Sequence, residues 1–389
     1  MNLAFLVPAF RKNQKEASTI TLLSLASALI DMGHKVIIIS NREDDLPEHE
    51  IVENDIHIYR PYKFFDLKVR VGINPLFFFD LILAHALGVR KAEERFGIHF
   101  DIIHSFSASS LLMLRAILAK KLSKNKKVVL IHSFKSISQY MFGLFLVHFF
   151  SFFFKKIIVQ STYQYNLLRK KGVKDKKIII VPSHINLHKF KPLNKNELKS
   201  SYGFLGKFVL MYYGHFLSEK GIEYLIKACS LISMDQRPFY KCLLIGSGLG
   251  ETNEYQKIIQ QEDVSEVVEI IHPNVNIVEY INLSDLVVLP YPYLKSTEAN
   301  PSCILESMAC KTPVLTSNIP ELTTFLSPNK NVFVAEPKNP DSIISKIKYI
   351  QDHQVIKEQV IEAAYQFSQK FGIDISAKRH NDIYDWILK

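Results

Sequence analysis

Short apolar runs alternate with helix-like segments in two blocks of this chain. Residues 2–7 form an apolar run, residues 17–32 carry apolar side chains at helical spacing, and a second apolar run follows at 36–39. The same order recurs in the second half, at residues 208–212, 222–231, 242–245 and 286–289. This alternation is typical of parallel sheets with helices on both faces. We therefore predict an α/β fold with two Rossmann-like domains whose parallel sheets face each other across a cleft.

The chain is long enough for two hydrophobic cores. It has 389 residues, of which 48% are hydrophobic, and a single core rarely grows beyond about 250–300 residues. The polar segment Lys191–Glu197 interrupts the apolar pattern. We expect an N-terminal domain of residues 1–188 and a C-terminal domain of residues 189–370.

The cysteines and the first residues indicate the compartment. Four cysteines, Cys229, Cys242, Cys303 and Cys310, show neither metal-site nor disulfide-framework spacing, which favours a reducing, cytoplasmic compartment. Residues 1–8 lack a basic start and a cleavage site of small residues. They are more typical of a first buried strand than of a signal peptide.

Positive charge is concentrated in the first half of the chain. Residues 1–190 hold 28 Lys+Arg and 15 Asp+Glu, net +13, and the remainder holds 20 and 23, net −3, which sums to +10. Residues 101–190 alone hold 16 basic and 2 acidic side chains. No nucleic-acid-binding motif accompanies this charge, so we expect no nucleic-acid partner. An anionic lipid acceptor, or peripheral contact with the anionic inner face of a membrane, is the favoured interpretation; a solvated basic face is the alternative.

Aromatic residues are dense beside this charge. Residues 140–154 form an apolar, phenylalanine-rich run before Lys155 and Lys156, but about 20 residues are needed to span a bilayer. The run is either a core helix before a strand at 157–159 or an aromatic segment that dips into a membrane. Residues 60–79 repeat the mixture of basic and aromatic side chains. Both segments are candidates for an acceptor site.

Two carboxylates flank a predicted helix start in the second half. Glu298 lies in the loop before the helix and Glu306 in its second turn. Asn300 is a favourable N-cap and Pro301 suits the first helical position. The amides of the next two residues, which have no acceptor within the helix, suit an anion; these are Ser302 and Cys303. The arrangement fits a diphosphate between two hydroxyl-rich groups, as in a nucleotide sugar.

Two glycine-containing loops are expected to follow strands of the second half. In the segment Gly214–Gly221, Gly214 permits a tight turn, and Lys220 can place an ammonium group on a phosphate, or be an ordinary solvated lysine. The segment Gly246–Gly250 lacks the G-x-G-x-x-G spacing of a nicotinamide site. We interpret it as a backbone turn near a nucleotide base.

One histidine of the first half is a candidate catalytic residue. The predicted strand at 128–131 ends at His132, and residues at the carboxyl ends of parallel strands reach the ligand site. His104, which ends the run 101–104, is expected to be structural or to face the acceptor. For any single histidine, a packed or surface position is the alternative.

These motifs resemble those of retaining glycosyltransferases of family 4, which have the GT-B fold. Glu298 and Glu306 match the E-x7-E signature, and Gly214–Gly221 is similar to the G-R-x3-K-G loop, with His215 at the arginine position. The resemblance implies that Glu298 and His132 are catalytic, that Glu306 binds ribose hydroxyls, and that Lys220 holds the donor diphosphate. It implies a donor site built from Gly214, His215, Lys220, Gly246, Asn300, Pro301, Ser302, Cys303 and Glu306.

The resemblance also implies an activity. The N-terminal domain would bind the acceptor, the C-terminal domain would bind a nucleotide-sugar donor, and a C-terminal helix at 371–389 would pack back onto the N-terminal domain. The sugar would pass to a lipid-linked or polysaccharide acceptor with retention. No Asp-x-Asp motif is present, so we expect catalysis without a metal or other cofactor.

Some positions depart from the family pattern. The loop at 8–17 contains no glycine, Ser183–Asn186 replaces the usual N-G-V-D, and His215 lacks the fixed charge and bidentate geometry of arginine. Weaker or more pH-dependent phosphate binding is expected. A nucleotide-sugar epimerase or phosphorylase of the same fold, and a catalytically silent GT-B subunit, are the alternatives.

Overall fold

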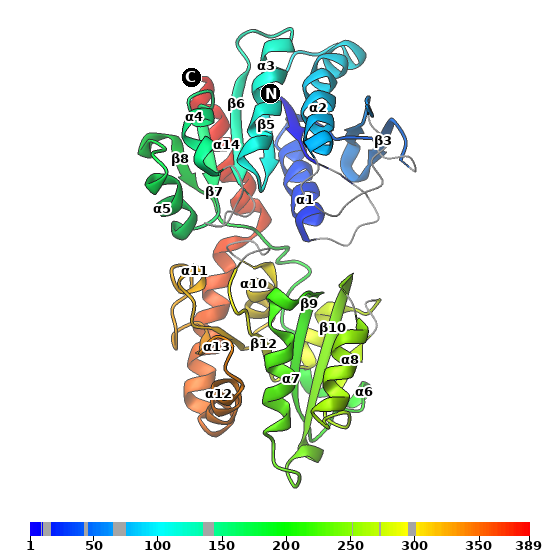
Figure 1. The fold of residues 1–389 in the computed structure, drawn as a ribbon, viewed down its shortest axis with the longest axis vertical. Helices are drawn as coiled ribbons and strands as arrows, with labels where there is room; N and C mark the ends of the chain where they lie inside the picture. Colours follow the sequence, from blue (N-terminus) through cyan, green and yellow to red (C-terminus); the bar gives the residue numbers. More distant parts are fainter. Residues whose placement is uncertain are drawn as a thin grey trace. The chain divides into compact units, whose positions relative to one another are not determined.

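The chain divides into two compact units in the computed structural model (Figure 1). Unit 1 comprises Met1–Ser183 and Ile373–Lys389, and unit 2 comprises His184–Gly372. The division therefore lies five residues before the boundary predicted at 188. The structure describes residues 1–8, 10, 17–42, 46–64, 75–134, 144–250, 252–271, 274–294 and 301–389.

Unit 1 is built on one eight-stranded sheet. The strand order is β3-β4-β2-β1-β5-β6-β7-β8, and all neighbours are parallel except β3 and β4. The strands are β1 (Asn2–Leu6), β2 (Lys35–Ile39), β3 (His49–Val52), β4 (Ile56–Tyr59), β5 (Ile102–Ser107), β6 (Val129–Phe134), β7 (Lys156–Val159) and β8 (Ile178–Ile180).

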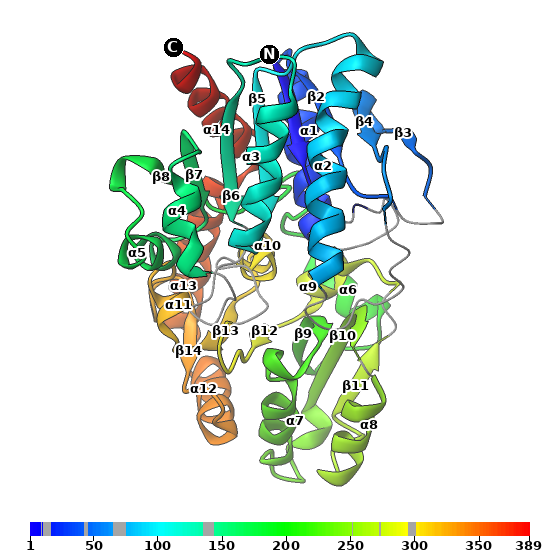
Figure 2. The same ribbon diagram turned by 45° about the horizontal axis from the view of Figure 1, so that its top comes forward.

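Helices cover both faces of this sheet. They are α1 (Ala17–Asp31), α2 (Pro75–Phe96), α3 (Met113–Leu122), α4 (Val147–Ser151), α5 (Thr162–Lys170) and α14 (Ile373–Leu388). Helices α2 and α3 pack side by side, as Figures 1 and 2 show, and α1 packs against α14. The C-terminal helix is thus part of unit 1.

The alternation within β1 shows how one sheet serves two cores. Leu3 and Phe5 belong to a core that includes Tyr384 of α14, whereas Ala4 and Leu6 belong to a second core that includes Val89 of α2. Successive side chains of a strand point to opposite faces. A strand buried on both faces is therefore apolar at every position, which is why the N-terminal run carries no polar alternation.

Unit 2 repeats the architecture with a six-stranded parallel sheet of order β11-β10-β9-β12-β13-β14. The strands are β9 (Phe208–Phe216), β10 (Tyr240–Gly250), β11 (Val268–Ile271), β12 (Leu286–Leu289), β13 (Val314–Ser317) and β14 (Phe333–Ala335). The helices are α6 (Lys195–Ser201), α7 (Ile222–Ser230), α8 (Thr252–Gln261), α9 (Ile277–Leu283), α10 (Ser302–Ala309), α11 (Pro320–Thr323), α12 (Pro340–Asp352) and α13 (Gln354–Ser368). The predicted α/β class with two Rossmann-like domains is confirmed.

The described part of the phenylalanine-rich run at 140–154 is not a fully buried core helix. Residues 140–143 lie outside the described residues, and residues 144–154 contain a short 3-10 turn (Leu144–Leu146) and α4. Leu144 and Phe154 are buried, but four phenylalanines of the same segment are exposed. No helix in the described ranges combines the length and apolar character that crossing a membrane requires.

Candidate functional site

The carboxyl ends of three neighbouring strands gather the candidate residues of unit 2. Ligands of doubly wound sheets bind at these ends. Gly214 of β9 and Gly246 of β10 are partners in the strand register, so the two predicted glycine loops do lie side by side. Both glycines are inside strands, however, so the predictions of a tight turn directly at Gly214 and of a backbone turn at Gly246–Gly250 were both wrong. Gly214 has a φ of 145° within β9, a conformation that favours glycine.

Gly221 brings the segment after β9 against the end of β12. A 3-10 turn (Ser218–Lys220) leads into Gly221, which has a φ of 73° and precedes α7. A Cβ atom at this position would lie 2.1 Å from the carbonyl oxygen of Pro290. Only glycine allows both the left-handed conformation and this close backbone approach.

Lys220 is held at this junction. Its side chain is 6% exposed, and Nζ lies 5.7 Å from the centre of the Tyr291 ring. An ammonium group over an aromatic face gains about 0.5–2 kcal/mol. The prediction placed Lys220 correctly next to the helix start, and its burial argues against an ordinary solvated lysine.

A chain of contacts joins Lys220 to the start of α10. The Tyr291 hydroxyl lies 3.2 Å from Cys303 Sγ. The Tyr213 hydroxyl donates to the Cys303 carbonyl oxygen at 2.7 Å and lies 3.1 Å from Glu306 Oε2. We call these five residues, Tyr213, Lys220, Tyr291, Cys303 and Glu306, the unit 2 cluster.

The start of α10 differs by one residue from the prediction. Pro301 is the N-cap, and Ser302 is the first helical residue. The helix closes its first turn with the Ile304 amide, which donates to the Pro301 carbonyl oxygen at 3.1 Å. The amides of Ser302 and Cys303 are thus first-turn donors with no acceptor inside the helix. Glu298 and Asn300 lie outside the described residues.

The electrostatics of the unit 2 cluster suit binding through hydrogen bonds. Burial, together with the charge of Glu306, raises the pKa of Tyr213 well above 10, and burial does the same for Tyr291. Both hydroxyls are therefore protonated donors near neutral pH. Burial also raises the pKa of Cys303 to about 11, although Lys220 acts in the opposite direction. Cys303 is a thiol rather than a thiolate nucleophile.

His215 contributes its backbone to the same strand end. It is half-buried in β9, and its carbonyl oxygen accepts a hydrogen bond of 2.8 Å from the Tyr212 hydroxyl. Burial raises the pKa of Tyr212 well above 10, so this donor stays protonated. The contact fixes the backbone next to Gly214.

His132 lies inside the core of unit 1. The predicted strand end at 131 was wrong, because β6 continues to Phe134. The imidazole is 0% exposed, packs edge-on against Phe134 and Phe154, and places Nε2 3.4 Å from Ser107 Oγ. Burial, followed by the charge of Arg115, lowers the pKa of His132 well below 6.5. His132 is therefore neutral, and its catalytic role stays a prediction.

Two further polar side chains lie in the sheet of unit 1. His104 is buried and contacts the Tyr384 hydroxyl and Ser133 Oγ, each at 2.7 Å, so it links α14 to β6. Arg115 of α3 is fully buried, and its guanidinium donates to the carbonyl oxygens of Leu6 and Phe106 at the carboxyl ends of β1 and β5. Its sequence signal is a single charge within the apolar run at 111–119, and no prediction named Arg115.

Metal ligation is not evident in the part of the chain that the structure describes. No group of three or more His, Cys, Asp or Glu side chains gathers there in a way that suits a metal ion. Metal-independent catalysis stays a prediction.

Two family models match successive parts of the chain. The model described as "Glycosyltransferase Family 4" matches residues 18–189, and the model described as "Glycosyl transferases group 1" matches residues 194–367. Together they cover nearly all of units 1 and 2. The chain belongs to the group 1, family 4-like glycosyltransferases of the GT-B fold.

Individual relatives of this glycosyltransferase are distant. An uncharacterized glycosyltransferase of Haemophilus influenzae is 24% identical over 162 residues, 41% of this chain and 44% of its own length. The phosphatidylinositol N-acetylglucosaminyltransferase gpi3 subunit of Schizosaccharomyces pombe is 24% identical over 376 residues, 94% of this chain and 76% of its own. The first three curated relatives are matched over only 44%, 51% and 52% of their own length, so the chain spans about half of them.

A solved structure supports the fold of the glycosyltransferase over its whole length. The Anabaena protein Alr3699/HepE, in complex with UDP, has a TM-score of 0.79 at 15% sequence identity. The match covers 99% of this chain and 100% of the Anabaena chain. At this identity the likeness concerns the fold alone.

Proposed function

We propose that this glycosyltransferase transfers a sugar from a nucleotide diphosphate donor that binds at the carboxyl ends of β9, β10 and β12. The observation that carries the proposal is the unit 2 cluster, in which the Tyr291 and Tyr213 side chains link a buried lysine, the start of α10 and the Glu306 carboxylate. A cation and the first-turn amides of a helix suit a diphosphate. A carboxylate suits a vicinal diol.

Each group of the cluster has a proposed role. Lys220 and the amides of Ser302 and Cys303 stabilise the departing diphosphate, as preorganised donors aimed at developing negative charge. Glu306 accepts hydrogen bonds from ribose hydroxyls, and its contact with Tyr213 at 3.1 Å holds the carboxylate in place. Glu298 and His132 act on the sugar, a role that rests on their resemblance to family motifs. The HepE structures with UDP and UDP-glucose support a nucleotide-sugar donor.

The acceptor of the proposed reaction is lipid-linked or a polysaccharide, and transfer occurs with retention and without a metal. Relatives that act at such acceptors by their names support this class: the gpi3 subunit of phosphatidylinositol N-acetylglucosaminyltransferase and CapM of capsular polysaccharide biosynthesis in Staphylococcus aureus. All four cysteines are unpaired, which supports a cytoplasmic location. A lipid-linked acceptor also requires that the protein meet the inner face of a membrane.

The first test is thermal stabilisation by UDP, GDP, ADP and their sugars. A ligand that binds only the folded state at 100 times its Kd stabilises the protein by about 2.7 kcal/mol. We expect one nucleotide base to stabilise the wild type and to stabilise Glu306→Ala much less. Glu358→Ala, which removes an exposed carboxylate of α13 in the same unit, serves as the matched control and should respond like the wild type.

The outcomes separate the alternatives. If no nucleotide stabilises the wild type, the unit 2 cluster is not a donor site and a silent subunit becomes the better account. If a nucleotide sugar stabilises the protein but the sugar is epimerised, or is released only with inorganic phosphate, the transferase proposal fails while the donor site stands. A requirement for Mn²⁺ that chelation reveals would contradict the metal-independent mechanism.

A further inference from the structure

Four exposed phenylalanines lie in one segment of unit 1. Phe145, Phe149, Phe152 and Phe153 are 71%, 59%, 54% and 46% exposed. Their spacing of four, three and one residues places them on one side of the turns around α4. The opposite side of the same turns, which carries Val147, Phe150 and other side chains, is buried. Full burial of one such side chain stabilises a fold by roughly 1.5–3 kcal/mol, so folding alone does not account for this row.

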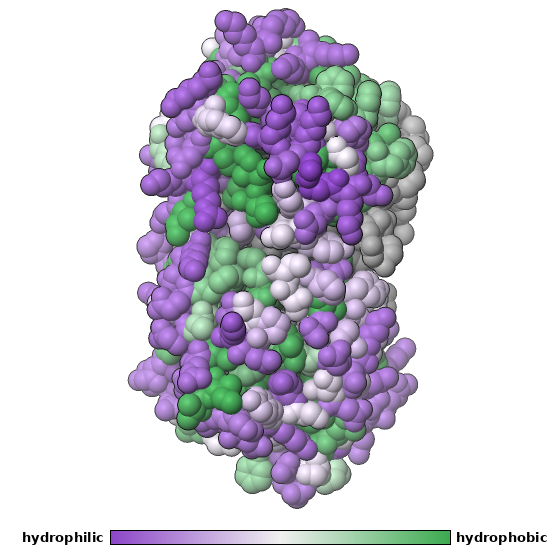
Figure 3. All heavy atoms as spheres, turned by 90° about the vertical axis from the view of Figure 1, so that its left-hand side faces the viewer, coloured by the Kyte–Doolittle hydropathy of each residue, from purple (hydrophilic) through white to green (hydrophobic). Residues whose placement is uncertain are grey.

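Two of the exposed rings contact each other, and one of them, Phe149, also contacts the buried Phe150. Phe149 and Phe153 lie edge to face with centroids 5.9 Å apart, and Phe152 lies 5.1 Å from the His148 ring. We call these four exposed phenylalanines the apolar patch. Figure 3 views the side of the molecule that carries α4, α5 and β8, where hydrophobic side chains interrupt the hydrophilic surface.

Lysines surround this patch. Between residues 144 and 180 the chain carries eight basic side chains and one acidic side chain, Asp175. Lys174 and Lys177 place Nζ 6.0 Å and 5.9 Å from the centre of the Phe152 ring. The basic residues are Lys155, Lys156, Arg169, Lys170, Lys171, Lys174, Lys176 and Lys177.

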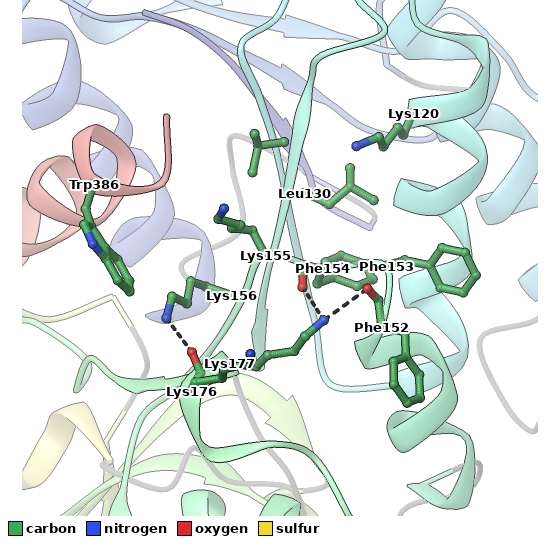
Figure 4. Close-up of a pocket in the computed structure, with 11 residues that line it drawn as sticks. Lys120, Leu130, Phe152, Phe153, Phe154, Lys155, Lys156, Lys176, Lys177 and Trp386 are labelled. Carbon is green, nitrogen blue, oxygen red and sulfur yellow. Dashed lines mark hydrogen bonds between the residues drawn. The ribbon is translucent and has the colours of Figure 1, made fainter. Parts of the chain in front are cut away.

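Beside the patch is a hollow of about 530 Å³. Figure 4 shows Trp386 of α14 on one side of it, Phe152 and Phe153 on the other, and lysines between them. Lys156 lies with Nζ 4.0 Å from the centre of the Trp386 ring. The lysines of the hollow are Lys120, Lys155, Lys156, Lys176 and Lys177.

The positive charge of the hollow is not neutralised within the described residues. None of its five lysines forms an ion pair with a carboxylate there. Lys156 and Lys177 donate instead to backbone carbonyl oxygens of Lys176 and Phe154. Burial and then neighbouring lysines lower the pKa of both groups. An anionic ligand would relieve this repulsion.

The surface is separate from the ligand end of the sheet. Val129 begins β6, Lys156 begins β7, and Lys177 directly precedes β8. The hollow therefore lies at the amino ends of these strands, whereas substrates of such sheets bind at the carboxyl ends. A role in docking fits this position better than a role in the reaction.

We propose that this aromatic–lysine surface, the four phenylalanines with Trp386 and the lysines of the hollow, docks the protein onto a bilayer containing anionic phospholipids. The rings enter the headgroup boundary, and the ammonium groups contact lipid phosphates. A second copy of the chain would bring like charges together, and no nucleic-acid-binding motif accompanies the charge. The proposal deepens the proposed function, on which it rests for the lipid-linked acceptor.

The test is cosedimentation of the whole protein with vesicles of phosphatidylcholine, with and without phosphatidylglycerol. We expect binding only to the vesicles that contain phosphatidylglycerol, and weaker binding at high salt. Two double variants should each weaken binding by roughly tenfold or more. One combines Phe149→Ser with Phe153→Ser, and the other combines Lys155→Gln with Lys176→Gln. Phe239→Ser, an exposed phenylalanine of unit 2, and Lys348→Gln with Lys370→Gln are the matched controls and should bind like the wild type.

Trp386 supplies a second readout. It is the only tryptophan of the chain, is 58% exposed and lines the hollow, so its emission should shift to shorter wavelength on the anionic vesicles. The proposal would be overturned if the protein did not bind vesicles, or if all variants bound them equally. It would also be overturned by a dimer or an RNA complex that depends on the same phenylalanines while vesicle binding is absent. Nucleotide stabilisation of the same variants should be unchanged, which separates failure of the docking proposal from failure of the donor site.

Discussion

Acid should destabilise unit 1 through its buried histidines. Burial lowers the pKa of His85 to about 3 and the pKa of His380 to about 4, and it lowers the pKa of His104 and His132 well below 6.5. In the unfolded chain these groups titrate near 6.5. As the pH falls below 6.5, the unfolded state binds protons that the folded state does not. Stability is therefore complete above pH 6.5 and is lost as the pH falls toward the folded pKa values.

The size of the loss follows from proton linkage. Between pH 7 and pH 5, one histidine that titrates at about 6.5 when unfolded and at about 4 or below when folded costs about 2 kcal/mol. His85 and His380 together cost about 4 kcal/mol, and His104 and His132 act in the same direction. Domains are typically stable by about 5–15 kcal/mol, so unit 1 should lose a substantial part of its stability at pH 5.

The assay is urea unfolding at pH 7 and pH 5, followed by fluorescence. Trp386 is the only tryptophan and belongs to α14 of unit 1, so its emission reports on this unit. We expect His380→Gln to reduce the loss between the two pH values by about 2 kcal/mol. His99→Gln, which replaces an exposed histidine of the same unit, should leave the loss unchanged. Equal losses in wild type and both variants would refute the linkage argument.

Two further predictions concern unit 2. Gly221→Ala places a Cβ atom against the Pro290 carbonyl oxygen at a φ of 73°, and should lower both the urea midpoint measured by circular dichroism and the stabilisation by nucleotide. Gly206→Ala, with a φ of 76° and no atom within 4 Å of the added Cβ, should cost only the conformational penalty of roughly 1–2 kcal/mol; equal effects of the two variants would exclude the close approach as the cause. Because the pKa of Cys303 is about 11, its thiol should react with iodoacetamide at pH 8 about a hundredfold more slowly than a free cysteine, as peptide mass spectrometry would detect. Rapid modification of Cys303 would contradict its protonated, buried state.

The fold could be predicted because its signal is local. The apolar runs of both halves became strands within one or two residues at most ends, since parallel strands buried on both faces need continuous apolar sequence. The exceptions are instructive. β9 and β10 continue through Gly214 and Gly246, because these glycines pair in register across the two strands. Only tertiary pairing, which no short window contains, decides such a strand end.

The site was predicted only in part for the same reason. Lys220 and Glu306 stand beside recognisable turn and helix-start signals, whereas Tyr213 and Tyr291 have none. These tyrosines reach Cys303 because β9 and β12 are neighbours in the sheet. The turn after α10 shows that a backbone conformation can be kept without its usual residue. Lys311 adopts a φ of 57° there, at a position where glycine is usual.

The most direct test of the donor site compares a nucleoside diphosphate with the nucleoside by calorimetric titration of wild type, Lys220→Gln and Glu306→Ala. A hydrogen bond to a charged group contributes about 1.5–3 kcal/mol, so each loss should be roughly tenfold to hundredfold in affinity. We predict that Lys220→Gln weakens the diphosphate and leaves the nucleoside unchanged, whereas Glu306→Ala weakens both. Equal affinity of all three proteins for both ligands would contradict the assignment of the unit 2 cluster as the donor site.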